Sequence, residues 1–337
     1  MLSSSAVYGC QGTTLAAQER DFFRSCSPFG FILFARNCDH PDQVRALCDS
    51  LRDAAGSDVP ILIDQEGGRV ARLKPPHWRA RPPARRFGEL FEKNSQGGRE
   101  AAYLCARAIA HELKDIGVNV NCAPVLDVPV MGAHDIIGDR AYAMDPSTVT
   151  ELGRATIDGY LDGGVLPIVK HIPGHGRALA DSHLALPRVD ATAEALATHD
   201  FVTFRSLNEA PIAMTAHVVY EAIDPQRPAT TSGKVVQTVI RGEIGFEGLL
   251  ISDDLSMAAL EGTLAMRAKL SFLAGCDVVL HCNGKLDEMI EIAQEAKPLA
   301  GRSLQRAEAA LSHLRAPLEL DIEACEARLA EMVGPIA

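Results

Sequence analysis

Short apolar runs rich in β-branched residues recur along the chain, and most are followed by a longer stretch in which apolar residues repeat with helical spacing. Such runs are typical of the buried strands of a parallel sheet, and such stretches of the helices that connect them. Eight alternations favour a closed (β/α)8 barrel over an open doubly wound sheet. The runs cover residues 6–9, 31–35, 61–64, 119–124, 167–171, 212–217, 249–253 and 277–282.

Helical spacing is clearest at residues 39–51, 101–109 and 235–244. No composition shift or linker divides the chain, so we predict an α/β fold with one (β/α)8 domain over residues 1–337. Residues 74–87 are proline-rich and basic, which predicts an irregular loop anchored by the single tryptophan, Trp78. Alanine- and glutamate-rich stretches predict extra C-terminal helices at 286–296, 303–314 and 322–333.

Polar side chains stand where most of the apolar runs end. In a (β/α)8 barrel, the carboxyl ends of the strands form the rim of the active site. If these polar residues only marked the starts of loops, one or two such clusters would be expected. Because the clusters recur at most strand ends, they predict an active site at this rim of the barrel. The clusters lie at residues 36–37, 64–66, 127, 170–171, 217, 252–254 and 281–283.

The net charge and the cysteine pattern exclude several classes of partner and site. The formal net charge of −11 argues against nucleic acid or an anionic membrane as the main partner, because both recruit a clustered positive field. The nine cysteines are scattered and form no Cys-x-x-Cys pair, which indicates reduced thiols rather than disulfides or a zinc module. No N-terminal secretion signal or membrane-length apolar run is recognisable, so we expect a cytoplasmic protein.

Four segments resemble the bacterial cytoplasmic β-N-acetylhexosaminidases of glycoside hydrolase family 3. They are Ile-Asp-Gln-Glu-Gly-Gly-Arg-Val at 63–70, Gly-Asp-Arg-Ala-Tyr at 138–142, Lys-His-Ile-Pro-Gly-His-Gly at 170–176 with Asp-Ser-His at 181–183, and Ser-Asp-Asp-Leu-Ser-Met at 252–257. The resemblance keeps the family's order from about residue 5 to residue 283.

The resemblance implies the catalytic residues. Asp253, directly after the apolar strand 249–251, corresponds to the nucleophile of a retaining glycosidase, which forms a covalent glycosyl-enzyme. We expect its neighbour Asp254 to cap the next helix. The proton donor is His183, oriented by Asp181, in place of the usual second carboxylate. An imidazole both donates and accepts protons near neutral pH when a carboxylate orients it.

The resemblance also implies that Asp64, Arg72, Arg140, Lys170 and His171 bind the sugar. A lysine at a buried strand end needs a partner to offset its desolvation, which also favours a functional role for Lys170. His171 and His175 have the spacing of a zinc-binding helix, but proline and glycine between them make a helix improbable. We therefore expect no metal and no cofactor, and instead a glycine-hinged loop that closes over the substrate.

The leading hypothesis is a monomeric enzyme that removes terminal β-linked N-acetylglucosamine, with muropeptides from peptidoglycan as the carbohydrate substrate that the family implies. A family 3 β-glucosidase or β-xylosidase would share the nucleophile but generally carries a further domain and a carboxylate acid. A metal-dependent amidohydrolase barrel would use His171, His217 and Asp253, and would need a His-x-His on the first strand, where Tyr-Gly-Cys stands at 8–10. A non-catalytic sugar-binding barrel is the remaining alternative.

Overall fold

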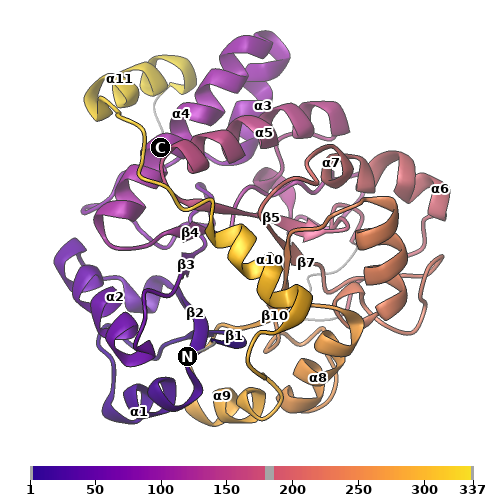
Figure 1. Cartoon of the computed structure of the whole chain (residues 1–337). Helices are drawn as coiled ribbons and strands as arrows, with labels where there is room; N and C mark the ends of the chain where they lie inside the picture. Colours follow the sequence, from indigo (N-terminus) through magenta and orange to yellow (C-terminus); the bar gives the residue numbers. More distant parts are fainter. Residues whose placement is uncertain (1–2, 179–185, 335–337) are drawn as a thin grey trace.

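The computed structural model describes residues 3–178 and 186–334, and in these ranges eight parallel strands close into a barrel (Figure 1). Neighbouring strands follow the order β1-β10-β9-β7-β5-β4-β3-β2. The predicted barrel is thereby confirmed, with every strand overlapping its predicted run. The strands are β1 (Ser4–Gly9), β2 (Pro28–Leu33), β3 (Ile61–Ile63), β4 (Val120–Asn121), β5 (Leu166–Ile172), β7 (Ile212–Thr215), β9 (Leu249–Asp254) and β10 (Val278–His281).

Helices surround the barrel, as predicted from the spacing of apolar residues between the strands (Figure 1). Proline at the first turn and Gly56 in the left-handed region define the ends of α2, and the Asp145 side chain caps α5. The helices are α1 (Ala17–Cys26), α2 (Pro41–Ala55), α3 (Ala84–Lys93), α4 (Ser95–Asp115), α5 (Pro146–Asp162), α6 (Ala193–Ala195), α7 (Phe201–Ser206), α8 (Leu264–Ala274), α9 (Leu286–Ala293), α10 (Gly301–Leu311) and α11 (Ile322–Val333).

Shorter helical segments complete the connections. The stretch predicted at 235–244 forms the π-helix η5 (Val235–Glu243), and a second π-helix, η3 (Leu196–Asp200), joins α6 to α7. The remaining segments are the 3-10 turns η1 (Ala35–Asn37), η2 (Gly138–Arg140) and η4 (Ala229–Thr231).

Alternate residues of each strand supply two hydrophobic layers. Val7 and Ile32 belong to a cluster that fills the inside of the barrel, whereas their neighbours Tyr8 and Phe31 pack with the surrounding helices. The inner cluster continues into Ala307 and Ala310 of α10, which lies across one end of the barrel (Figure 1). That end is therefore closed by apolar side chains.

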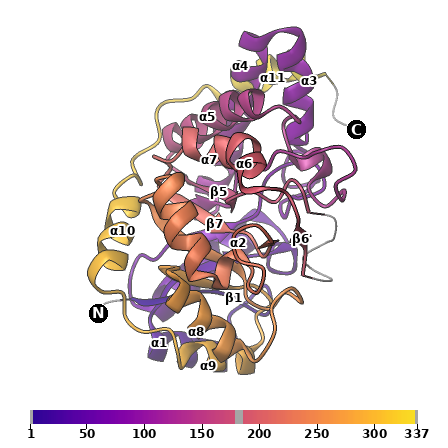
Figure 2. The same cartoon turned by 90° about the vertical axis from the view of Figure 1, so that its right-hand side faces the viewer.

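The opposite end of the barrel carries a small sheet that the sequence did not predict. It consists of β6 (Arg188–Val189) and β8 (Val219–Tyr220), which pair in parallel. Figure 2 shows β6 and α10 on opposite sides of the molecule. Two-residue strands carry no periodic signal, which is why the pattern of apolar positions missed them.

The proline-rich segment is partly helical, so its prediction was wrong at its C-terminal end. Residues 74–83 lack regular structure, but α3 begins at Ala84, directly after two prolines that suit a helix N-terminus. Trp78 is buried and packs edge-on against His77, consistent with an anchor for the loop. Across residues 3–178 and 186–334, none of the helices is both long and apolar enough to cross a membrane.

Candidate active site

A cavity of about 410 Å³ opens at the carboxyl ends of the barrel strands. Its wall combines carboxylates, cations and apolar side chains such as Phe34 and Met257. The structure brings together at this cavity every predicted site residue that it describes, namely Asp64, Arg72, Arg140, Lys170, His171 and Asp253. The predicted pair Asp181 and His183 lies outside the described residues.

The strands place these side chains by simple local features. Asp64 follows the last residue of β3, and the chain then turns sharply at Gly67 and Gly68, where φ is +103° and +54°. On β5, the pairing with β7 shifts register between Lys170 and Ile172. A bulge of this kind re-aims neighbouring side chains, and both Lys170 and His171 line the cavity.

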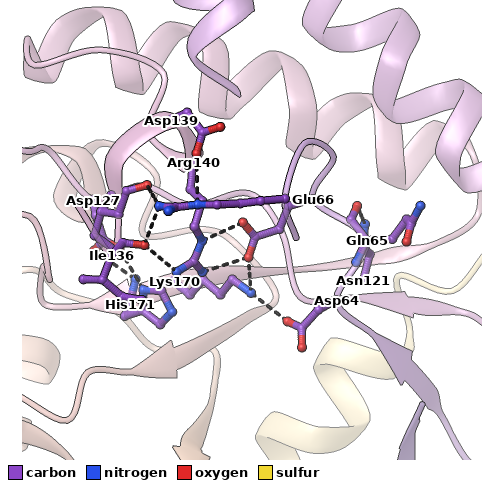
Figure 3. A network of polar contacts seen from close by, with 12 residues as sticks. Asp64, Gln65, Glu66, Asn121, Asp127, Ile136, Asp139, Arg140, Lys170 and His171 are labelled. Atoms are coloured by element: carbon purple, nitrogen blue, oxygen red, sulfur yellow. Dashed lines mark hydrogen bonds and ion pairs between the residues drawn. The ribbon is translucent and has the colours of Figure 1, made fainter. Parts of the chain in front are cut away.

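Five charged side chains form an alternating ladder along the cavity wall, and Figure 3 shows its members Asp64, Lys170, Glu66 and Arg140. Arg72 Nη2 lies 3.2 Å from Asp64 Oδ2, and Lys170 Nζ lies 2.8 Å from Asp64 Oδ1 and 2.7 Å from Glu66 Oε1. Glu66 in turn binds Arg140. The ladder holds three cations and two carboxylates, so it keeps one net positive charge beside the cavity.

The ladder sets the protonation states of its members. Burial alone would raise the carboxyl pKa values, but Lys170 and Arg72 hold the pKa of Asp64 well below its usual range. Arg140 and Lys170 likewise lower the pKa of Glu66 to about 2, against the effect of burial. The same contacts raise the pKa of Lys170, although burial opposes this. All three groups are therefore charged at neutral pH.

Asp127 connects two histidines at the cavity. The carboxylate is fully buried, and its Oδ2 lies 2.7 Å from His171 Nδ1. Its Oδ1 accepts hydrogen bonds from the backbone N–H groups of His171 and His175, at 3.1 and 2.7 Å. Despite burial, the two histidines lower the pKa of Asp127, so it is a carboxylate and His171 Nδ1 carries a proton toward it. His171 Nε2 is then the ring nitrogen that Asp127 does not hold, and His171 lines the cavity.

Asp253 occupies the end of β9 and lines the cavity. Its backbone N–H lies 3.3 Å from Thr215 Oγ1, and its Oδ1 accepts a hydrogen bond of 2.8 Å from the backbone N–H of Asp254. Burial alone would raise the pKa of Asp253. The neighbouring His217 and His171 lower this pKa by more, so the net shift is downward. Asp253 thus presents an ionised carboxylate at the cavity, with Oδ1 held by the backbone N–H of Asp254.

Asp254 does not cap a helix, so that prediction was wrong. The next helix, α8, begins ten residues later and is capped by Thr263. Asp254 Oδ1 instead accepts from the backbone N–H groups of Ser256 and Cys282, and Oδ2 accepts from the Ser256 hydroxyl at 2.6 Å. Asp254 therefore ties the turn after β9 to the end of β10.

Some polar residues at the strand ends serve the fold rather than the cavity. The Asn37 amide donates to the carbonyl oxygens of Cys10 and Gly12. Gln65 accepts from the backbone of Arg72 and Leu73, which fixes the loop that follows β3. For these residues the simpler interpretation, that polar residues mark loop starts, is the right one.

Glu66 and Asp127 are site residues whose contacts the sequence reasoning missed. Both stand at predicted strand ends, but their partners Arg140 and His171 lie 74 and 44 positions away. The sequence signal that could have revealed these contacts is a carboxylate at the end of one buried strand and cationic residues at the ends of other strands.

The geometry around His217 does not favour the metal-dependent alternative. Its Nδ1 lies 2.7 Å from Thr230 Oγ1 and its Nε2 lies 3.0 Å from the carbonyl oxygen of Asp254, so both ring nitrogens have hydrogen-bond partners. Residues 171–172 end β5 and residues 173–176 have no helical structure, as predicted from the proline and glycines. In the described ranges, no group of three or more His, Cys, Asp or Glu side chains is arranged to hold a metal ion.

Comparison with known proteins points to one family. Residues 16–315 match the glycosyl hydrolase family 3 N-terminal domain. A β-hexosaminidase of Alkalilimnicola ehrlichii is 41% identical over 287 residues, covering 84% of this chain and 82% of the relative. The crystal structure of NagZ from Neisseria gonorrhoeae is 29% identical with a TM-score of 0.89, covering 99% of both chains. Its complex with N-trifluoroacetyl-D-glucosamine matches with the same identity, TM-score and coverage.

Proposed function

The chain belongs to glycosyl hydrolase family 3, and we propose that it is an exo-acting, retaining β-N-acetylglucosaminidase. Its β-N-acetylhexosaminidase activity is supported by the similarity to the Alkalilimnicola β-hexosaminidase and to NagZ. The observation that carries the proposal is the placement of the ionised Asp253 in the same cavity as the charge ladder Arg72–Asp64–Lys170–Glu66–Arg140.

The proposed mechanism has two steps. In the first, Asp253 Oδ2 attacks the anomeric carbon and the bond to the leaving oxygen breaks, while His183, oriented by Asp181, protonates that oxygen. In the second, the same imidazole takes a proton from water, which displaces Asp253 and restores the free carboxylate. The lowered pKa of Asp253 suits this role because the nucleophile must be ionised.

The ladder and His171 are proposed to hold the sugar. Asp64 offers acceptor oxygens to two hydroxyl groups, and Lys170, Arg72 and Arg140 offer donors. His171 Nε2 adds a further polar contact, with Asp127 fixing the imidazole through Nδ1. These contacts would bind the hydroxyl groups of the terminal, non-reducing sugar, as expected for an enzyme that removes single sugar units from a chain end.

The proposed natural substrate is a peptidoglycan-derived muropeptide that ends in N-acetylglucosamine. This part of the proposal comes from the family resemblance of the four motifs. The N-trifluoroacetyl-D-glucosamine complex of the Neisseria protein supports recognition of an N-acylated glucosamine by a relative of this fold.

The decisive assay compares an aryl β-N-acetylglucosaminide with the matching aryl β-glucoside, each with and without a chelator. We expect hydrolysis of the first to exceed that of the second by at least about a hundredfold, because a site that hydrogen-bonds a substrate amide rejects the analogue that lacks it. Equal rates would favour the β-glucosidase alternative, and loss of activity with chelator would favour a metal-dependent enzyme. A slow fluorinated N-acetylglucosaminide should label Asp253; labelling of Asp254, or none, would overturn the covalent mechanism.

A further inference from the structure

Three buried polar side chains lie behind Asp253 without lining the cavity. Thr215 ends β7, His217 follows it by two residues, and Thr230 lies in the 3-10 turn η4. All three are completely inaccessible to solvent. Burying a polar side chain is costly unless it is hydrogen-bonded, so each of these three side chains needs a hydrogen-bond partner inside the protein.

Their hydrogen bonds close a ring through the backbone of Asp253 and Asp254. The backbone nitrogen of Asp253 lies 3.3 Å from Thr215 Oγ1, which lies 2.8 Å from Thr230 Oγ1. Thr230 Oγ1 lies 2.7 Å from His217 Nδ1, and His217 Nε2 lies 3.0 Å from the carbonyl oxygen of Asp254. The ring therefore begins at the N-terminal end of the Asp253–Asp254 pair and returns at its C-terminal end.

The proton positions in this ring follow from the acceptors. A carbonyl oxygen only accepts, so His217 Nε2 must carry a proton. Burial lowers the pKa of His217, so its imidazole is neutral at neutral pH. Nδ1 of this imidazole therefore accepts a hydrogen bond from the Thr230 hydroxyl. The single proton of the Thr230 hydroxyl is then shared between His217 Nδ1 and the carbonyl oxygen of Ala216, to which Thr230 also donates at 3.1 Å. Thr230 must accept from Thr215, and Thr215 accepts from the backbone N–H of Asp253.

Each hydroxyl in the ring thus donates one hydrogen bond and accepts another in a single direction. Between the two clamped ends, the N–H of Asp254 holds Asp253 Oδ1 at 2.8 Å. One carboxylate oxygen is therefore fixed to the backbone, and the backbone is fixed by the ring. These contacts therefore also fix the position of the remaining oxygen, Oδ2, of a residue that lines the cavity.

We propose that Thr215, Thr230 and His217 are positioning residues, which aim the carboxylate of Asp253 at the anomeric carbon by clamping the Asp253–Asp254 segment at both ends. This inference rests on the proposed role of Asp253 as nucleophile. Because none of the three side chains lines the cavity, breaking the ring should slow the attack by Asp253 and leave sugar binding unchanged. A displacement of about 1 Å in a reacting group costs on the order of a hundredfold in rate.

The test uses Thr230→Val and Thr215→Val, which keep the side-chain shape and remove the hydroxyl. We expect kcat on an aryl β-N-acetylglucosaminide, and the rate of Asp253 labelling by a slow fluorinated sugar, to fall at least about tenfold with KM within about twofold. Thr230→Ser and Thr215→Ser retain the hydroxyl and should recover most of the rate. The matched control is Thr203→Val, which removes a buried hydroxyl that bonds the carbonyl oxygen of Leu126 elsewhere in the fold.

The outcomes separate this inference from the proposed function. If Asp253→Asn keeps full activity, Asp253 is not the nucleophile and the proposed mechanism fails. If Asp253→Asn is inactive but both valine variants match Thr203→Val in kcat, the mechanism stands and the ring is purely structural. Serine variants that fold normally, measured by thermal unfolding, but lose as much kcat as the valine variants would also overturn the inference.

Discussion

Glu66 binds Arg140 through both of its carboxylate oxygens, with Arg140 Nε 2.9 Å from Oε2 and Nη2 2.9 Å from Oε1. Lys170 Nζ adds a third contact at 2.7 Å. A carboxylate held by two cations, with its pKa lowered to about 2, carries no proton to donate at neutral pH. Glu66 is therefore poorly suited to replace His183 as the general acid and is better placed to hold Lys170 and Arg140 in position.

The first prediction concerns this holding role. Glu66→Gln removes the charge that joins Lys170 to Arg140 and should lower kcat/KM roughly 10- to 100-fold, mainly through KM, because charged hydrogen bonds are worth roughly 1.5–3 kcal/mol. Steady-state kinetics on an aryl β-N-acetylglucosaminide measures this. Glu89→Gln, which neutralises a solvent-exposed partner of Arg86, is the matched control. A selective loss of kcat on poor leaving groups would instead assign Glu66 to proton donation.

A second prediction follows from the lowered pKa of Glu66. Between about pH 4.5 and 2 the unfolded chain binds a proton at this position that the folded protein does not, so stability falls as the pH falls through this range. The contribution is fully present above about pH 4.5. In Glu66→Gln this part of the pH dependence is missing. Urea unfolding should show the stability difference between the two proteins shrinking from pH 6 toward pH 3, and a constant difference would contradict the ion-pair argument.

A third prediction concerns Lys170 and Asp64, which are 2.8 Å apart and both face the cavity. Lys170→Ala and Asp64→Ala should each cost roughly 2–4 kcal/mol in kcat/KM, because each removes a contact to the sugar and leaves its partner buried without a counter-charge. The double variant should lose less than the sum of the single variants, since the stranded partner is gone. Lys285→Ala, at an exposed ion pair, is the control. Losses below tenfold would mean that neither residue contacts the substrate.

A fourth prediction tests Asp127, which holds His171 Nδ1 at 2.7 Å. In Asp127→Asn the amide keeps one acceptor oxygen for the backbone but presents an N–H to the imidazole, so the proton of a neutral His171 should move to Nε2. The neutral imidazole would then present a donor at Nε2, where the other tautomer presents an acceptor. We expect KM to rise roughly fivefold, at about 1 kcal/mol for one mismatched hydrogen bond, and the nitrogen NMR shifts of His171 to show the other tautomer. Unchanged shifts with unchanged KM would contradict this role.

The barrel could be predicted well from the sequence because the signal for each of its strands lies within a few consecutive residues. Each strand is a short apolar run, and the alternation of Val7 with Tyr8 already separates the inner from the outer layer. Pairings between distant carboxylates and cations have no such signal. Glu66 and Arg140 come from different loops, and only closure of the barrel brings them together. For the same reason, Asp254 looked like a helix cap from its position alone, although it bonds Ser256 and Cys282.

The fifth prediction concerns His183 and Asp181, because a histidine pair distinguishes the proposed mechanism from glycosidases with two carboxylates. If His183 is the general acid, His183→Ala should slow cleavage of a sugar leaving group far more than cleavage of an activated aryl group, which needs little protonation. The same imidazole activates water in the second step, so the glycosyl-enzyme should accumulate and a burst of aryl alcohol should precede slow turnover.

Azide distinguishes loss of a base from loss of structure in His183→Ala. As an anion it attacks the glycosyl-enzyme without needing a base, so it should restore turnover and yield the β-glycosyl azide, because two displacements retain the configuration. Asp181→Asn should give a weaker form of the same pattern, since the imidazole stays but loses the carboxylate that orients it and stabilises its charged form. Equal losses on good and poor leaving groups, with neither a burst nor azide rescue, would remove His183 from the chemistry. Since Glu66 is held ionised by Arg140 and Lys170, the proton donor would then have to be sought elsewhere at the cavity.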